Sequence, residues 1–251
     1  MIDTDTVGPT ASRSVCLHDV DPDVARAIPE KDRPLGRRAL TMPEMVVEAG
    51  AQVTCDVSDV LGLLVVEGTL WREVRVARGA APQLLARGSV LLCEPPPGEL
   101  LAPTESTVAL AATRLAVLDR RFMLAATRWP GVLSVFHERL AEQQRDLAIQ
   151  IAIAHLPRVD ERVNLLLWHL AERWGKMRGD GVHLPLKLTH ASLGRFVGAR
   201  RPTVSLAVAQ LRDRGVLDRA DDGTWILLGD PPSSNGAHPQ TGTAAVVPNI
   251  L

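Results

Sequence analysis

The sequence predicts an α+β protein in which a β domain comes first, a long helix follows, and a helical domain ends in a β-hairpin. Short apolar runs broken by turn residues fill residues 39–118, a pattern typical of an all-β domain. From residue 119 to residue 174 the apolar positions recur every three or four residues, which indicates helices. Two short apolar runs then flank Asp222-Gly223, a pair that favours a tight hairpin turn.

The composition is that of a globular protein, with 46% hydrophobic and 23% charged residues in 251, and it excludes a disordered chain. No apolar stretch approaches the roughly 18 residues that a membrane span needs, and no signal peptide is visible, so we expect a cytoplasmic protein. Cys16, Cys55 and Cys93 are too few and too far apart for a disulfide framework or a zinc motif. The seven histidines lack metal-ligand spacing, and we expect neither a metal nor a cofactor.

The predicted β domain spans residues 17–128 and follows a polar segment, residues 1–16, that we expect to be a disordered tail. Short helices are expected within residues 17–28 and 121–128. Proline lacks an N–H and fixes φ, so Pro95–Pro97 must lie in a loop. The expected strands are the apolar runs 45–47, 52–57, 61–66, 70–76, 83–86, 89–93 and 106–118, the last long enough for two strands.

A long helix is predicted over residues 129–156, because apolar and amide side chains alternate in steps of three and four along one face. This predicted seam consists of Leu133, Phe136, Leu140, Gln143, Leu147, Gln150 and Ala154. It has two interpretations, packing against the chain's own β domain or pairing of two chains in a dimer. The length of the helix and the polar glutamines favour the dimer interface.

After a hinge at Pro157, the segment from Leu188 to Leu211 has the pattern of a helix-turn-helix. Thr189 is a good N-cap for a first short helix, and Gly198 can adopt the positive φ of a tight turn. Arg200 or Arg201 caps the second helix, where a proline in the first turn costs no hydrogen bond. The hairpin around Asp222-Gly223 makes the whole segment, residues 157–229, a winged helix, and we expect residues 230–251 to be a second disordered tail.

Charge supports a nucleic-acid partner for this segment. Residues 187–219 carry seven Lys or Arg and two Asp, a net charge of +5, although the whole chain sums to −1. A basic surface beside a helix-turn-helix is the footprint of double-stranded DNA binding. The alternative is a structural three-helix unit with a solvated charged face.

The order of these parts resembles the Crp/Fnr family of bacterial transcription regulators over about residues 17–229. The resemblance is most specific in Leu188–Leu217, where Leu-Thr-x-x-x-Leu-Gly-x-x-Val-Gly-x-x-Arg-x-Thr-Val-Ser is close to the family's helix-turn-helix signature. It implies a β-roll (jelly roll) similar to a cyclic-nucleotide-binding domain, a dimerisation helix and a winged helix-turn-helix. It also implies a homodimeric, sequence-specific transcription regulator without enzymatic activity, for which RNA polymerase is a candidate partner.

On this resemblance Arg201 matches the family's first base-reading arginine, while Pro202 and Leu206 stand where the family has a glutamate and a second arginine. Arginine can donate to both acceptors of a guanine, and hydroxyl groups can bind phosphates. The sequence therefore contains six candidate DNA-binding residues, namely Thr189, Arg195, Arg200, Arg201, Thr203 and Ser205.

The effector site departs further from the family. Gly98-Glu99 is retained, and Glu99 is the candidate ligand-binding residue, but no basic residue lies between Arg87 and Arg114 to hold a cyclic phosphate. We therefore expect that cAMP does not control the protein through the usual pocket. A regulator that responds to a cyclic nucleotide or another small ligand in the β-roll is the alternative. A cupin-like enzyme is a remote one, because residues 39–118 contain no histidine.

Overall fold

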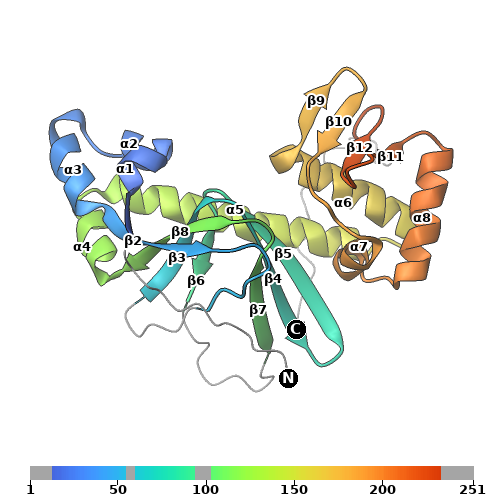
Figure 1. Cartoon of the computed structure of the whole chain (residues 1–251), viewed down its shortest axis with the longest axis horizontal. Coiled ribbons are helices and arrows are strands. Elements are labelled where there is room, and N and C mark those ends of the chain that lie inside the picture. Colours follow the sequence, from blue (N-terminus) through green and yellow to red (C-terminus); the bar gives the residue numbers. More distant parts are fainter. Residues whose placement is uncertain (1–12, 55–59, 94–102, 233–251) are drawn as a thin grey trace, which may run out of the picture. The chain divides into compact units, whose positions relative to one another are not determined.

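The computed structural model describes residues 13–54, 60–93 and 103–232, which form two compact units. Of the described residues, those up to 155 together with 194–199 form the first unit, and 156–193 together with 200–232 form the second. Figure 1 shows strands, then a long helix, then a second group of helices and short strands along the chain. The predicted α+β fold with a β-roll, a long helix and a helix-turn-helix is confirmed.

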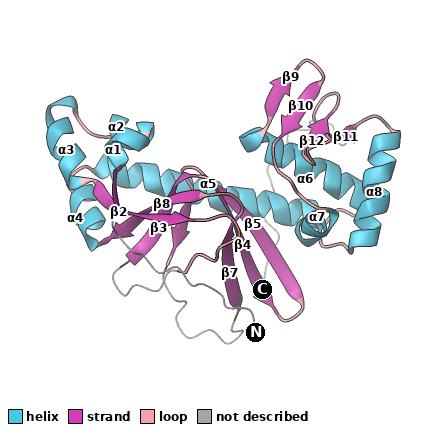
Figure 2. Cartoon of the chain, viewed as in Figure 1, coloured by secondary structure: helices cyan, strands magenta, loops and turns pink. Residues whose placement is uncertain are grey.

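Two antiparallel sheets make up the β-roll of the first unit (Figure 2). The five-stranded sheet has the order β1-β2-β8-β3-β6, with β1 at Arg13–Cys16, β2 at Thr41–Val47, β8 at Thr113–Asp119, β3 at Val60–Glu67 and β6 at Val90–Leu92. The three-stranded sheet has the order β5-β4-β7, with β5 at Gly79–Ala86, β4 at Thr69–Val76 and β7 at Thr104–Ala109.

The continuous apolar run in β3 is explained by burial on both faces of its sheet. Leu63 and Val65 belong to a core cluster that also contains Leu70 and Leu85 of the other sheet. Leu64 and Val66 point to the opposite face, into a cluster that the helices of this unit complete. Because successive side chains of a strand alternate between faces, a strand with two buried faces has no polar positions.

Helices cover the second face of the five-stranded sheet. They are α1 (Leu17–Val20), α2 (Pro22–Arg26), the 3₁₀ helix η1 (Glu30–Asp32), α3 (Arg33–Ala39), α4 (Arg120–Ala126) and α5 (Pro130–Ala154). Asp21 caps α2, accepting hydrogen bonds from the N–H groups of Asp23 and Val24. The Arg139 guanidinium of α5 donates to both Asp21 carboxylate oxygens, at 2.6 and 2.8 Å, and so ties α5 to α2.

Three expectations are corrected by the first unit. Residues 13–16 are not part of a tail but form β1, because Val15 is buried and the strand pairs with β2. The run 52–57 makes only an isolated bridge from Gln52 to Val108 where it is described. Cys93 is disulfide-bonded and Cys16 is a free thiol. Residues 1–12, Glu99 and residues 233–251, for which tails and a ligand contact were predicted, lie outside the described residues.

The second unit combines helices with a four-stranded sheet. The helices are α6 (Val159–Trp174), the beginning of α7 (His190–Val197) and α8 (Arg201–Asp213). The sheet has the order β11-β12-β10-β9, with β11 at Leu217–Arg219, β12 at Trp225–Leu227, β10 at Gly181–Leu184 and β9 at Lys176–Arg178. The predicted hairpin is therefore present as β11 and β12, and β12 also pairs with β10 of a second hairpin, which β9 and β10 form.

Candidate DNA-binding interface

The turn between α7 and α8 is built by capping and by one glycine. The Thr189 hydroxyl accepts a hydrogen bond from the Ser192 N–H at 3.1 Å, which makes this threonine the N-cap that the sequence predicted. Gly198 has φ of +62°, and the Ala199 N–H donates to the Gly194 carbonyl at 2.9 Å. A side chain at position 198 would be strained in this conformation, so the predicted role of the glycine is confirmed.

Helix α8, the second helix of the predicted helix-turn-helix and the candidate recognition helix, has a buried face and a solvent-facing one. Val204, Ala207, Val208 and Leu211 are buried in the second unit. Arg201, Pro202, Thr203 and Leu206 are exposed. Arg200 is the N-cap residue, with extended backbone, and its side chain makes no capping hydrogen bond. Both arginines therefore stand at the positive end of a helix, where backbone N–H groups also favour an anion.

Ser205 connects the recognition helix to α7 through a histidine. Its hydroxyl donates to the Arg201 carbonyl at 3.0 Å, and its Oγ lies 2.8 Å from His190 Nδ1. Since the single hydroxyl hydrogen goes to the carbonyl, the imidazole must donate to Oγ. The ring also lies 6.1 Å from that of the fully buried Trp225, whose Nε1 donates to the Leu188 carbonyl. His190 was not predicted as a site residue, because an isolated histidine in a helix carries no recognisable spacing signal.

The surroundings of His190 favour its neutral form. Burial lowers the pKa of the imidazole below its ordinary value, and the nearby Arg219 and Arg201 guanidinium groups lower the pKa further. At neutral pH the ring is therefore an uncharged hydrogen-bond donor. It positions Ser205 without adding a cation to the helix terminus.

The structure separates the basic residues of 187–219 into paired and unpaired ones. Arg212 pairs with Asp218 at 3.0 Å, and Arg214 pairs with Asp160 of α6 at 2.7 Å. No acidic group among the described residues forms an ion pair with Arg200 or Arg201. Arg200 and Arg201 at the start of α8 are thus among the cations that remain available to a phosphate backbone, which the net charge alone could not show.

Arg195, another predicted DNA-binding residue, is engaged elsewhere. Residues 194–199 cluster with the first unit, and there the Arg195 guanidinium lies 2.5 Å from a carboxylate oxygen of Glu73 on β4. Glu73 is 1% exposed and also pairs with Arg75. Burial opposes ionisation of this carboxyl, but hydrogen bonds from the two arginines outweigh it and lower the pKa of Glu73. In this conformation Arg195 is not free to contact DNA.

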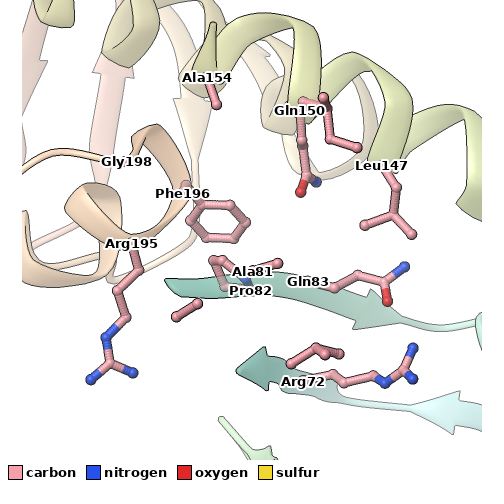
Figure 3. A pocket seen from close by; sticks show the side chains of 13 residues that line it. Arg72, Ala81, Pro82, Gln83, Leu147, Gln150, Ala154, Arg195, Phe196 and Gly198 are labelled. Atoms are coloured by element: carbon pink, nitrogen blue, oxygen red, sulfur yellow. The ribbon is translucent and has the colours of Figure 1, made fainter. Parts of the chain in front are cut away.

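The same unit contains a pocket of about 400 Å³ between α5 and the β4 and β5 strands (Figure 3). Leu147 and Gln150 project from α5 toward Gln83 on β5, and Phe196 closes one side. The Phe196 ring makes an edge-to-face contact with Trp71 at 5.2 Å between centroids. The lining is mostly apolar with a few polar side chains, which is typical of small-molecule sites.

Several residues of the predicted seam lie in contacts within their own chain. Phe136 is buried in a core cluster of the first unit, and Leu133 and Leu140 pack against that cluster. The Gln143 amide accepts from the Val90 N–H at 2.8 Å and donates to the Val90 carbonyl at 3.0 Å. Leu147, Gln150 and Ala154 line the pocket. The alternative interpretation, packing against the chain's own β domain, describes the first four of these residues, and the dimer interface stays a prediction.

The residues that directly follow each seam residue in the sequence form a second face of α5, and all of them are exposed. This outward stripe keeps the same alternation of three and four residues and consists of Ser134, His137, Ala141, Gln144, Ala148 and Ile151 of α5, followed by the C-cap residue His155. Ile151 is 59% exposed although it is a large apolar side chain. Among the described residues, no cluster of His, Cys, Asp or Glu is suited to a metal ion, and no helix is long and apolar enough to cross a membrane.

Comparison with known proteins agrees with this geometry. Residues 161–233 match the family model described as the Crp-like helix-turn-helix domain. Among solved structures, a CooA mutant from Carboxydothermus hydrogenoformans has 19% identity and a TM-score of 0.60, over 74% of this chain and 83% of that one. A Crp-family transcriptional regulator from Thermus thermophilus has 18% identity and a TM-score of 0.57, over 74% and 92%.

A cyclic nucleotide-binding domain containing protein from Listeria monocytogenes EGD-e is similar as well, with 15% identity and a TM-score of 0.63, over 82% of this chain and 96% of that one. No curated protein matches the chain in sequence. The resemblance predicted from the sequence is confirmed. The chain carries a Crp-like helix-turn-helix domain, and its fold is similar to those of these solved structures.

Proposed function

We propose that this protein is a sequence-specific regulator of transcription that binds double-stranded DNA as a homodimer in the cytoplasm. The observation that carries the proposal is the start of α8, where Arg200, Arg201 and Thr203 are exposed beside a helix N-terminus in a domain of the Crp-like type. A helix presented in this way enters the major groove with its N-terminal end, and RNA polymerase is then a candidate partner.

The dimer is proposed to form through the outward stripe of α5 rather than through the predicted seam. Four seam residues, Leu133, Phe136, Leu140 and Gln143, already contact the core or β6 of the first unit, and the other three line the pocket. The outward stripe, in contrast, keeps coiled-coil spacing along the 25-residue helix α5, and its side chains are exposed. Two recognition helices related by such a dimer would read half-sites about 34 Å apart on a near-palindromic duplex.

The test is a titration of the full-length protein with a duplex selected from a random pool, at several salt concentrations. Replacing Arg200 and Arg201 by alanine should weaken binding and lower the salt slope by about 0.9 for each phosphate that the variant no longer neutralises. The matched control replaces the exposed Arg38 and Arg120 of the first unit, which changes the charge equally. Unchanged affinity and slope in the Arg200/Arg201 variant, or no duplex selected at low salt, would contradict the proposal.

A second candidate function is a regulator controlled by a small ligand, which the pocket between α5 and β4–β5 favours. Its volume of about 400 Å³ suits a molecule of nucleotide size or smaller. Thermal shift with cyclic mono- and dinucleotides tests it, with Leu147→Trp as a variant that fills the pocket. A shift of the melting temperature that the variant abolishes would support ligand control. Equal shifts in both proteins would exclude this pocket.

A further inference from the structure

The recognition helix exposes a leucine that its own packing does not need. Leu206 is 61% exposed, and the core face of α8 is already filled by Val204, Ala207 and Val208. Pro202, one turn earlier on the same side, is also exposed. An isolated large apolar side chain on a surface is unremarkable in general, but this one lies in the first two turns of a recognition helix.

The chemistry of leucine limits what it can read there. Its side chain has no donor or acceptor, so it cannot hydrogen-bond to a base edge. The apolar group that bases present in the major groove is the 5-methyl group of thymine. Unpaired Arg200 and Arg201 at the start of the same helix supply the charge that places α8 against phosphates.

We propose that Leu206 contacts the 5-methyl group of a thymine in the major groove and so makes thymine the preferred base at one position of each half-site. The inference rests on the proposed function and adds the chemical class of base that the helix selects. Arg201 would then supply phosphate or guanine contacts, and Leu206 would supply discrimination without hydrogen bonds.

The experiment uses deoxyuridine, which keeps every hydrogen-bonding group of thymidine and lacks only the methyl. A duplex is selected from a random pool with the full-length protein, and each thymine of the selected site is then replaced singly. Affinities are measured at low salt, so that weakened variants still bind. The proteins are the wild type, Leu206→Ala, and Leu124→Ala as a matched control, since Leu124 is 68% exposed on α4 of the other unit.

For the wild type, one thymine in each half-site should respond to loss of its methyl with about a fourfold loss of affinity. Leu206→Ala should bind thymine and deoxyuridine duplexes equally at that position, and Leu124→Ala should behave as the wild type. The inference is overturned if no thymine responds, or if Leu206→Ala keeps the fourfold ratio, which would assign the effect to DNA shape. If the pool yields no bound duplex at all, the proposed function fails first, and Leu206 becomes a candidate protein contact.

Discussion

The side chains at and beside the start of α8 differ in chemistry: some carry charge, one orients a neighbour and one is apolar. Arg200 and Arg201 carry unpaired charge, His190 fixes Ser205 by a hydrogen bond, and Leu206 offers an apolar surface. Protonation of His190 would strengthen the attraction of this surface for phosphate. It would also bury a charged imidazole and place it beside two arginines that repel it, so the neutral form is favoured.

This balance predicts a pH dependence that belongs to His190. Its pKa is lowered in the folded protein, so the unfolded chain binds the proton more readily, and stability falls as pH drops below the ordinary value of about 6.5. Denaturation of the wild type and His190→Gln at pH 5.5 and 7.5 measures the effect. We expect the wild type to lose more stability at the lower pH than the variant. Equal losses would show that another group titrates.

At the scale of elements, Arg139 of α5 forms a buried ion pair with Asp21, the cap of α2, and a second ion pair with Asp23 of α2. The side chains of Arg139 and Asp21 are 14% and 8% exposed. Burial opposes ionisation of Asp21, but the hydrogen bonds from Arg139 and from the N–H groups of α2 outweigh it and lower the pKa of the carboxyl. Removing one partner of such a pair leaves an uncompensated charge inside the protein.

We therefore expect Arg139→Ala to lower the free energy of unfolding by about 3 kcal/mol. The control is Arg26→Ala, which removes an ion pair to Asp23 whose side chains are 76% and 49% exposed. Exposed pairs of this kind contribute less than about 1 kcal/mol. Urea denaturation of both variants provides the comparison. Similar losses would mean that the Asp21 pair is no more important than a surface pair.

The outward stripe of α5 leads to a prediction about assembly. A charge at Ala141 or Ala148 should dissociate the dimer, because two such charges would face each other across a paired helix. Sedimentation of Ala148→Glu should therefore show a monomer. Ala111→Glu, at an exposed alanine between β7 and β8, should remain dimeric. A dimer in both variants would place the interface away from this stripe.

At the scale of the whole molecule, residues 194–199 belong in sequence to the Crp-like domain but cluster with the first unit. The ion pair from Arg195 to buried Glu73 is the polar part of that association, and the contact between Trp71 and Phe196 is the apolar part. An arginine held by a carboxylate is unavailable to a phosphate, so we expect this contact to compete with the DNA contact predicted for Arg195.

Glu73→Gln should therefore release Arg195 and raise the salt slope of DNA binding by about 0.9, the value for one added phosphate contact. Combining it with Arg195→Ala should abolish the increase. Glu105→Gln is the matched control, because Glu105 pairs with Arg72 in the same sheet and does not contact Arg195. Fluorescence anisotropy across a salt series measures the slopes. No change in Glu73→Gln would show that Arg195 does not compete for DNA.

The order of the elements and the identity of the DNA-reading segment could be predicted from the amino-acid sequence alone. Those features depend on local rules, such as the strand alternation of β3, the cap at Thr189 and the positive φ of Gly198. Local rules act over a few residues, and a single sequence records them directly.

Which side chains remain free, in contrast, depended on the tertiary fold. The fold buries Phe136 of the predicted seam, bonds Gln143 to β6 and leaves the neighbouring stripe exposed. It also pairs Arg195, Arg212 and Arg214 with carboxylates while Arg200 and Arg201 have no acidic partner among the described residues. A periodic pattern shows which residues share a helix face, but not which part of the protein packs against that face. Net charge gives the number of cations, but not which of them form ion pairs. Those outcomes depend on contacts between residues far apart in the chain, which is why they required the fold.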